Sequence, residues 1–166
     1  MGIEERLQKL EDDRAIRDLK ARYLRACDTK DPEAVRACLL ADGAVIAYDG
    51  FPPFDNRDDF VAVYAQMGCA TGIFDIHHGA NGILSFESDS RATGQWSLFF
   101  HNINLAGKTL TQMGVEYDDV YVKQDGRWWI SETRSKRLSC LIHSVDEAGA
   151  ATVVVMGDPP ASFGEA

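Results

Sequence analysis

The sequence contains no long apolar run and carries little positive charge. No stretch of about 18 consecutive apolar residues occurs, so no segment is expected to cross a membrane. Lysine and arginine number 17 against 26 aspartate and glutamate residues, which gives a formal net charge of -9. Nucleic-acid binding requires a basic surface that neutralises phosphates, and the chain lacks one overall. We therefore expect neither a membrane nor a nucleic acid as a partner.

Motifs that hold a nucleotide or a metal are also missing. The sequence has no Gly-x-Gly-x-x-Gly stretch, no phosphate loop and no Gly-x-Ser-x-Gly elbow. Its histidines form no helical i, i+4 pair and have no Cys or Glu at the spacing of zinc ligands. One metal-binding arrangement is still open, in which His77 and His101 lie next to each other on neighbouring strands. We predict a protein without cofactor or metal.

The cysteines do not form a recognisable framework. They are scattered, with no Cys-x-x-Cys pair, at Cys27, Cys38, Cys69 and Cys140. No secretory leader precedes the first charged helix, so reduced thiols in a cytoplasmic protein are expected. A thiol in a helix is commonly buried as a small hydrophobic group.

Hydrophobic residues make up 45% of the 166 residues, enough for the core of one domain. The one dense basic cluster of the second half comprises Arg134, Lys136 and Arg137. Its pattern favours a solvated strand face over a rim for an anionic ligand.

The segment from Ile16 to Asp28 organises the chain. Apolar residues recur in it at spacings of three and four, which predicts a helix packed against a core. The helical pattern starts at Ile3, but its phase breaks over residues 11–13, where we expect a restart or a bend. A short second helix should follow Asp31, to about Leu40, and a third should start after Asn56.

From residue 73 the period changes to two. Long strands are predicted over residues 73–87, 92–104, 109–123 and 127–140, with a short earlier strand over 45–48. The turns between the long strands are short, which makes neighbours antiparallel. The layout is α+β, and glycines in the strands should curl the sheet into a half-barrel closed by three helices, enclosing a pocket.

The C-terminal part differs in composition. We assign residues 1–143 to the domain and 144–166 to a Gly-, Ala- and Pro-rich tail. The apolar run over residues 151–156 could add an edge strand used in a subunit contact. Because sheet faces left open by such a half-barrel commonly pack against another copy, we expect a homo-oligomer, either a dimer or a trimer.

An acid at the end of the first helix is the sharpest candidate for chemistry. Asp28 stands at the negative end of the helix dipole and needs a compensating group, for which His77 or His78 is suitable. A histidine held by a carboxylate can move a proton, and the hydroxyl of Tyr23 can donate to a developing oxyanion. The alternative is that Asp28 is a solvated turn residue and Tyr23 a core residue. Aromatic residues on the inner strand faces would favour a flat, apolar ring as substrate.

The sequence resembles members of the SnoaL-like branch of the nuclear-transport-factor-2-like superfamily, which have a cone-shaped, cystatin-like α+β fold. The resemblance covers residues 10–133 and rests on three stretches: the first helix through Tyr23, Asp28 and Asp31, then residues 77–81, then 114–119 leading into 125–130. It is nearest to scytalone dehydratase and bile-acid 7α-dehydratase. The acid pair of ketosteroid isomerase is not identifiable.

In those dehydratases a tyrosine and an aspartate on the first helix act with a histidine on a later strand. The resemblance assigns these roles to Tyr23, Asp28 and His77, which stands four residues before Asn81, with His78 as the alternative ring. Scytalone dehydratase has a second essential histidine, for which His101 is a loose candidate.

The resemblance implies a cofactor-independent dehydratase that acts on a small hydrophobic, cyclic hydroxy-carbonyl compound, as in polyketide or steroid metabolism. A double-bond isomerase that uses the same base is the alternative within enzymes. A noncatalytic binding protein, or a structural subunit like the small subunit of ring-hydroxylating dioxygenases, is the alternative outside them.

Overall fold

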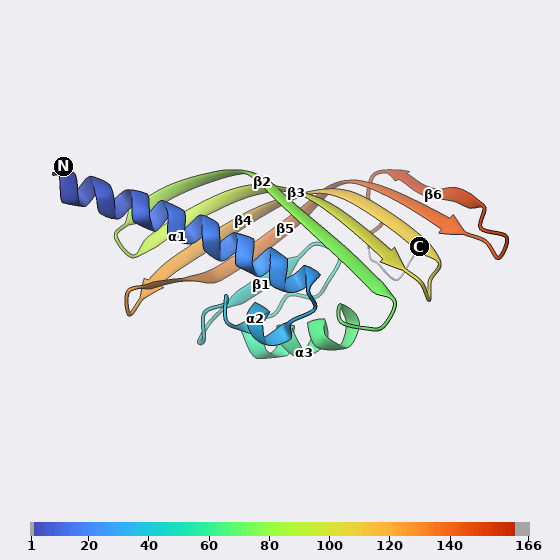
Figure 1. Ribbon diagram of the computed structural model, residues 1–166, viewed down its shortest axis with the longest axis horizontal. Coiled ribbons are helices and arrows are strands. Elements are labelled where there is room, and N and C mark those ends of the chain that lie inside the picture. The colour runs from blue at the N-terminus through green and yellow to red at the C-terminus, as the bar shows by residue number, and fades with distance from the viewer. Residues whose placement is uncertain (1, 162–166) are drawn as a thin grey trace.

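Three helices cover one side of a curved six-stranded sheet in the computed structural model, which describes residues 2–161 (Figure 1). The helices are α1 (Ile3–Asp28), α2 (Pro32–Arg36) and α3 (Arg57–Met67). The strands are β1 (Val45–Tyr48), β2 (Ile73–Ser88), β3 (Arg91–Asn104), β4 (Thr109–Gln124), β5 (Arg127–Val145) and β6 (Ala151–Gly157). The α+β class predicted from the sequence is confirmed.

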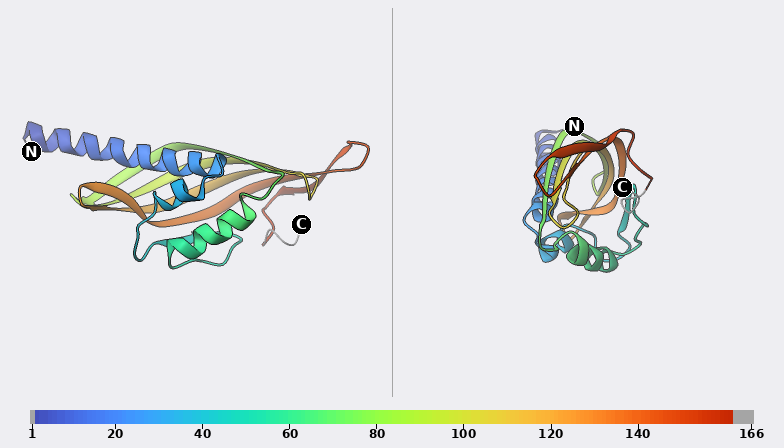
Figure 2. Two further views of the ribbon diagram at one scale, coloured as in Figure 1. Left: turned by 60° about the horizontal axis from the view of Figure 1, so that its bottom comes forward. Right: turned by 90° about the vertical axis from the view of Figure 1, so that its right-hand side faces the viewer.

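The sheet is mixed and does not close. Its order is β1-β5-β4-β3-β2, and β6 also pairs with β5. Among the strands within residues 2–161, β1 runs parallel to its neighbour β5, and the other pairs are antiparallel. The four long strands match their predicted bounds within one residue, except that β5 continues five residues further. The end-on view in Figure 2 shows how the sheet curls around the space that the helices close.

Several register shifts shape the long strands. β2 carries a bulge between Ala80 and Ile83, and the β4–β5 register shifts between Gly114 and Val115 and again between Val120 and Tyr121. Bulges bend a strand and increase its twist. Beside the first bulge, a Cβ on Gly79 would lie 2.6 Å from the Leu24 side chain on α1. Glycine therefore lets β2 approach α1 closely.

The restart, one of the two expectations near residue 12, does not occur, because α1 is continuous from Ile3 to Asp28. Asp12 faces the sheet, where its carboxylate accepts hydrogen bonds from Lys123 Nζ and Trp128 Nε1, both at 2.7 Å. Burial opposes its ionisation, but these donors outweigh that effect and lower the pKa of Asp12. The apolar stripe is interrupted because a paired polar side chain occupies this position.

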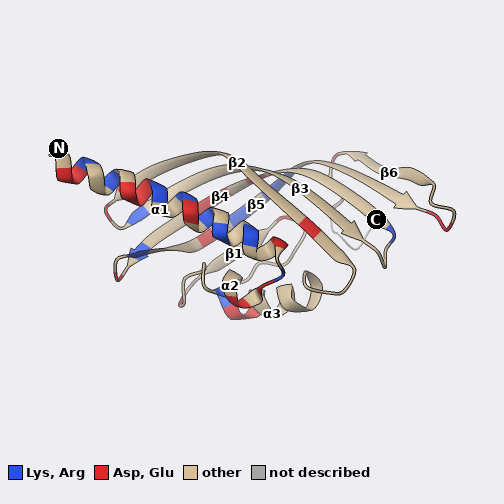
Figure 3. Ribbon diagram, viewed as in Figure 1, with Lys and Arg blue, Asp and Glu red and all other residues tan. Residues whose placement is uncertain are grey.

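The core lies between α1 and the concave face of the sheet. Its α1 residues are mostly apolar and include Ile16, Leu19 and Leu24. Lys20 is also buried there, with Nζ 2.7 Å from Asp119 Oδ2, and the two side chains are 2% and 0% exposed. Elsewhere acidic and basic residues alternate along α1 (Figure 3). None of the helices within residues 2–161 has the length and apolar character that a membrane crossing requires.

The tail adds the predicted edge strand. β6 pairs with residues 140–145 of β5 in antiparallel register. The division at residue 143 and the use of β6 in a subunit contact remain predictions, as does the homo-oligomer. Residues 162–166 of the tail lie outside the described residues.

Candidate active site

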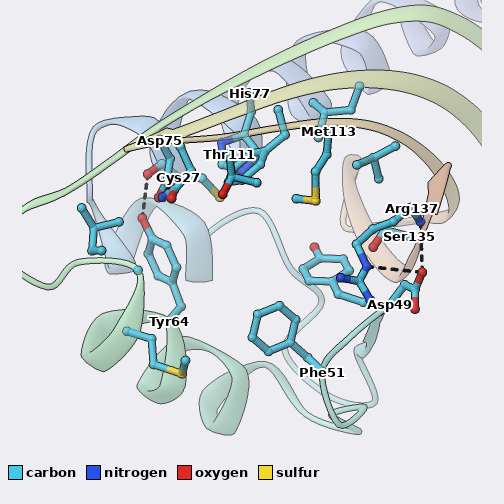
Figure 4. Close-up of a pocket in the computed structure, with 18 of the residues that line it drawn as sticks. Cys27, Asp49, Phe51, Tyr64, Asp75, His77, Thr111, Met113, Ser135 and Arg137 are labelled. Atoms are coloured by element: carbon cyan, nitrogen blue, oxygen red, sulfur yellow. Dashed lines mark hydrogen bonds and ion pairs between the residues drawn. The ribbon is translucent and has the colours of Figure 1, made fainter. Parts of the chain in front are cut away.

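A cavity of about 550 Å³ lies between the concave face of the sheet, the C-terminal end of α1 and α3. Much of its wall is aromatic, with side chains from Tyr23, Tyr48, Phe51, Phe54, Phe60, Tyr64, Phe100 and Tyr117. Figure 4 shows His77, Asp75 and Thr111 together on one side of this space and Arg137 with Asp49 on another. The cavity is open to a ligand, and its apolar surface suits a ring compound.

Asp28 and His77 meet at this wall. Asp28 is the last residue of α1, and His77 lies in β2. Asp28 Oδ1 lies 2.6 Å from His77 Nδ1 and 3.0 Å from the His77 backbone nitrogen. Because an ionised carboxylate only accepts hydrogen bonds, this contact places a proton on Nδ1, so that in the neutral ring Nε2 is the unprotonated nitrogen. The His77 ring packs against Phe100, with 4.8 Å between ring centroids.

The end of α1 is held in place by its own cap and by α3. The backbone N–H of Asp31 donates to the Ala26 carbonyl at 3.1 Å, and that of Lys30 to the Cys27 carbonyl at 3.4 Å. This is the Schellman arrangement that commonly ends a helix. Tyr64 on α3 donates its hydroxyl to the Cys27 carbonyl at 2.9 Å. Asp28 therefore projects from a fixed helix end.

Two tyrosine hydroxyls form a pair at the same cavity. Tyr23 on α1 and Tyr48 on β1 are hydrogen-bonded through their OH groups, and both line the cavity. Burial raises the pKa of each well above its usual value, so both remain protonated. One of the two protons lies between the two oxygens, and the further hydrogen-bonding neighbours of the pair are Cys27 at Tyr23 and Thr133 at Tyr48.

Cys27, which lies between Tyr23 and Asp28 in the sequence, also lines the cavity. Burial, reinforced by the charge of Asp28, raises the pKa of its thiol to about 12. The group is therefore a neutral thiol at neutral pH.

The other two predicted histidines lie away from the cavity. In the β2–β3 register, His78 is opposite Phe99 and His101 is opposite Ile76. Because side chains alternate across a strand, both histidines face the outer side of the sheet, opposite to His77. The structure therefore removes His78 and His101 from the predicted site. The same alternation excludes a metal site shared by His77 and His101.

Arg137 departs from the expected solvated face. Arg134 and Lys136 are exposed, but the β4–β5 register shift between Val120 and Tyr121 reverses the facing of the β5 residues after Ser131 and places Arg137 on the inner face, where its side chain is 4% exposed and lines the cavity. Its backbone N–H donates to Asp49 Oδ2 at 3.1 Å and, with help from the guanidinium, lowers the pKa of Asp49. Nη2 donates to the Pro160 carbonyl at 2.8 Å. Alternation alone could not reveal this, because a bulge reverses the facing of the residues that follow it.

The cavity aromatics also differ from those expected. Of the strand aromatics, Phe100 and Tyr117 line the cavity, whereas Trp96, Tyr121 and Trp128 are buried in the core. Five of the other six rings come from the stretch that runs from β1 through α3, namely those of Tyr48, Phe51, Phe54, Phe60 and Tyr64. A signal was available there, because Phe51 and Phe54 flank two prolines in a loop that would otherwise be polar.

Within residues 2–161 no three His, Cys, Asp or Glu side chains are grouped as a metal ion would need. The residues that meet at the cavity are a carboxylate-held imidazole and a protonated tyrosine pair. Such a set can take a proton from carbon and stabilise the oxyanion that forms.

Comparison with known proteins gives consistent matches. A model of the SnoaL-like domain matches residues 8–134. The crystal structure of LinA superposes with a TM-score of 0.75 at 19% identity, covering 93% of this chain and 98% of that chain. A scytalone dehydratase-like protein of Novosphingobium aromaticivorans gives 0.73 at 20% identity, covering 96% and 97%. Hexachlorocyclohexane dehydrochlorinase LinA-type3 of Novosphingobium barchaimii gives 0.69 at 19% identity, covering 93% and 99%. At these identities the superpositions establish a shared fold.

Proposed function

The chain belongs to the SnoaL-like domain family, and we propose that it is a cofactor-independent lyase that removes water from a hydrophobic, cyclic hydroxy-carbonyl compound. The observation that carries this proposal is the 2.6 Å contact between His77 Nδ1 and Asp28 Oδ1 at the wall of an open, aromatic cavity. His77 is the general base and then the general acid. Asp28 orients it, and Tyr23 with Tyr48 donates to the carbonyl oxygen.

The first step is removal of a proton from the carbon next to the carbonyl. His77 Nε2 accepts this proton, and the electrons of the C–H bond move onto the carbonyl oxygen. The Tyr23–Tyr48 pair donates a hydrogen bond to the enolate oxygen that results. A positioned base contributes about 10² to 10⁴ in rate, and an oxyanion donor about 10² to 10³.

The second step expels the hydroxyl group from the adjacent carbon. The enolate re-forms the carbonyl, a carbon–carbon double bond appears, and the C–O bond breaks. The leaving oxygen takes the proton from His77 Nε2 and departs as water. The ring returns to its initial state with Nδ1 still bound to Asp28, so one group serves both steps.

Two observations support catalysis over a purely structural subunit. That alternative predicts a cavity filled by aromatic side chains or a separated Asp28 and His77, and neither is the case. The dehydrochlorinase and the scytalone dehydratase-like protein are both named for eliminations, which favours a lyase over a double-bond isomerase.

The test is a screen of cyclic β-hydroxy ketones for loss of one water, followed by mass spectrometry. On any substrate that reacts, His77→Gln should lower turnover by about 10² to 10⁴. His78→Gln is the matched control, since it makes the same change one residue away on the outer face. Equal turnover in the wild type and His77→Gln would refute the proposal, and a product of unchanged mass would indicate an isomerase.

A further inference from the structure

Two contacts, one beside the other, connect the end of α1 to β2. Asp28 meets His77, and Lys30, two residues after Asp28, forms an ion pair with Asp75, two residues before His77. Lys30 adopts the left-handed conformation, with φ of 58°, at the position of the helix cap where glycine is usual. A lysine in this conformation costs about 1 kcal/mol relative to glycine. This unfavourable backbone conformation therefore occurs at a residue, Lys30, whose side chain pairs with a carboxylate in the cavity.

Asp75 belongs to a polar row that crosses three strands. In the sheet register Asp75 is opposite Asn102 on β3, and Asn102 is opposite Thr111 on β4. All three line the cavity. Asn102 Nδ2 donates to Asp75 Oδ1 at 2.6 Å, and the Asp75 side chain is only 10% exposed. The row is therefore ordered before a ligand arrives.

The neighbouring row is apolar apart from the base itself. His77 is opposite Phe100, which is opposite Met113. A strand advances about 3.3 Å per residue, so the two rows are separated by about 6.6 Å along the sheet. A ligand whose reacting carbon lies at His77 is thus surrounded there by apolar side chains. The polar row lies about one or two ring lengths further along the sheet.

The row consists mainly of hydrogen-bond acceptors. Within the described part of the chain, the Asn102 side-chain oxygen and the Thr111 hydroxyl have no hydrogen-bond partner, and Asp75 has acceptor capacity beyond its bonds to Asn102 and Lys30. The carboxylate of Asp75 disfavours an anionic group. Lys30 neutralises its charge, so a cationic group is not required either. An uncharged O–H donor fits best.

We propose that Asp75, Asn102 and Thr111 form a subsite that binds a second hydroxyl group of the substrate, at the end of the molecule opposite its carbonyl. The substrate class is then a hydroxylated fused-ring ketone rather than a wholly apolar ring. This inference rests on the proposed function, because it takes His77 as the position of the reacting carbon.

The test measures binding without turnover, by calorimetry with 2-tetralone and 6-hydroxy-2-tetralone, two bicyclic ketones that differ by one hydroxyl. The wild type should bind the hydroxylated probe about 10- to 100-fold more tightly, the range for a hydrogen bond to a charged group. Lys30→Gly, which suits the left-handed backbone and leaves Asp75 in place, should keep this preference. Adding Asp75→Leu to Lys30→Gly should abolish it.

Glu116→Gln is the matched control, since it neutralises an exposed acid outside the cavity and should change nothing. Thermal melts establish that each variant is folded. Equal affinity of the wild type for both probes, survival of the preference in the double variant, or no binding of either probe up to its solubility limit would overturn the subsite. A preference without any water loss from hydroxy ketones would instead refute the proposed function and leave the subsite intact.

Discussion

The carboxylate of Asp28 holds His77 at two points, accepting from the ring Nδ1 at 2.6 Å and from the backbone N–H at 3.0 Å. The first contact fixes which ring nitrogen carries the proton. The second fixes the strand to the helix end. One side chain thus determines both the tautomer and the position of the proposed base.

Asp28→Asn should separate these two effects. Its amide oxygen can still accept the backbone N–H, so the fold should persist. Its NH₂ group would donate to Nδ1, which moves the ring proton to Nε2 and disables the base. We expect turnover to fall by about 10² to 10⁴. Nitrogen NMR of the His77 ring should show the change of tautomer, and an unchanged tautomer with unchanged turnover would contradict the assignment.

The Tyr23–Tyr48 pair predicts a graded response. Tyr23→Phe or Tyr48→Phe leaves one hydroxyl in the cavity, so each should lower kcat by about tenfold, less than the full effect of an oxyanion donor. The double variant should lose about 10² to 10³. Steady-state kinetics on a verified substrate, with melting curves as the control for folding, check this. Full activity in the double variant would contradict this account, because another group would then have to donate the hydrogen bond to the carbonyl oxygen.

The tyrosines also predict how the protein responds to alkali. Burial is the main cause that raises the pKa of all five, Tyr23, Tyr48, Tyr64, Tyr117 and Tyr121. In the unfolded chain they ionise near pH 10, so their contribution to stability is complete below that pH and declines above it. Tyrosinate absorbance should therefore rise only together with alkaline unfolding, followed by circular dichroism. A tyrosine that titrates near pH 10 in the folded protein would contradict its burial.

The buried Lys20–Asp119 pair predicts a large stability effect. Lys20→Met leaves the Asp119 carboxylate in the core without its cation, which should cost about 3 to 5 kcal/mol in the free energy of unfolding. Adding Asp119→Asn removes the stranded charge and keeps an acceptor for the Tyr121 hydroxyl, which now donates to Asp119 at 2.7 Å. Urea melts should show that the double variant recovers most of the loss. A double variant less stable than Lys20→Met would contradict this account.

Much of the fold could be predicted from the sequence because its signals are local. A period of two and short polar turns define β2 to β5, and Asp31 caps α2 by accepting from the backbone N–H of Ala34. Asp28 could be singled out because an acid at a helix end requires a partner. Choosing His77 over His78 required knowledge of which face of β2 meets the helix.

The features that the sequence did not reveal depend on long-range contacts. Asp12 interrupts the apolar stripe of α1, but its partners Lys123 and Trp128 are more than a hundred residues away. Lys20 cannot be distinguished from a surface lysine until Asp119 is placed opposite it. Arg137 faces inward because the β4–β5 register shifts between Val120 and Tyr121, opposite an earlier part of β5, and no single-strand pattern contains such a shift.

The most direct measurement is deuterium incorporation at the carbon next to the carbonyl of 6-hydroxy-2-tetralone in D₂O, followed by NMR. The exchange rate reports proton removal by the proposed base alone, because exchange needs no leaving group. The wild type should accelerate exchange above the rate in buffer, and His77→Gln should return it to that rate while still binding the probe. Acceleration that persists in His77→Gln, or a wild type that binds the probe without accelerating exchange, would contradict the assignment of His77 as the base.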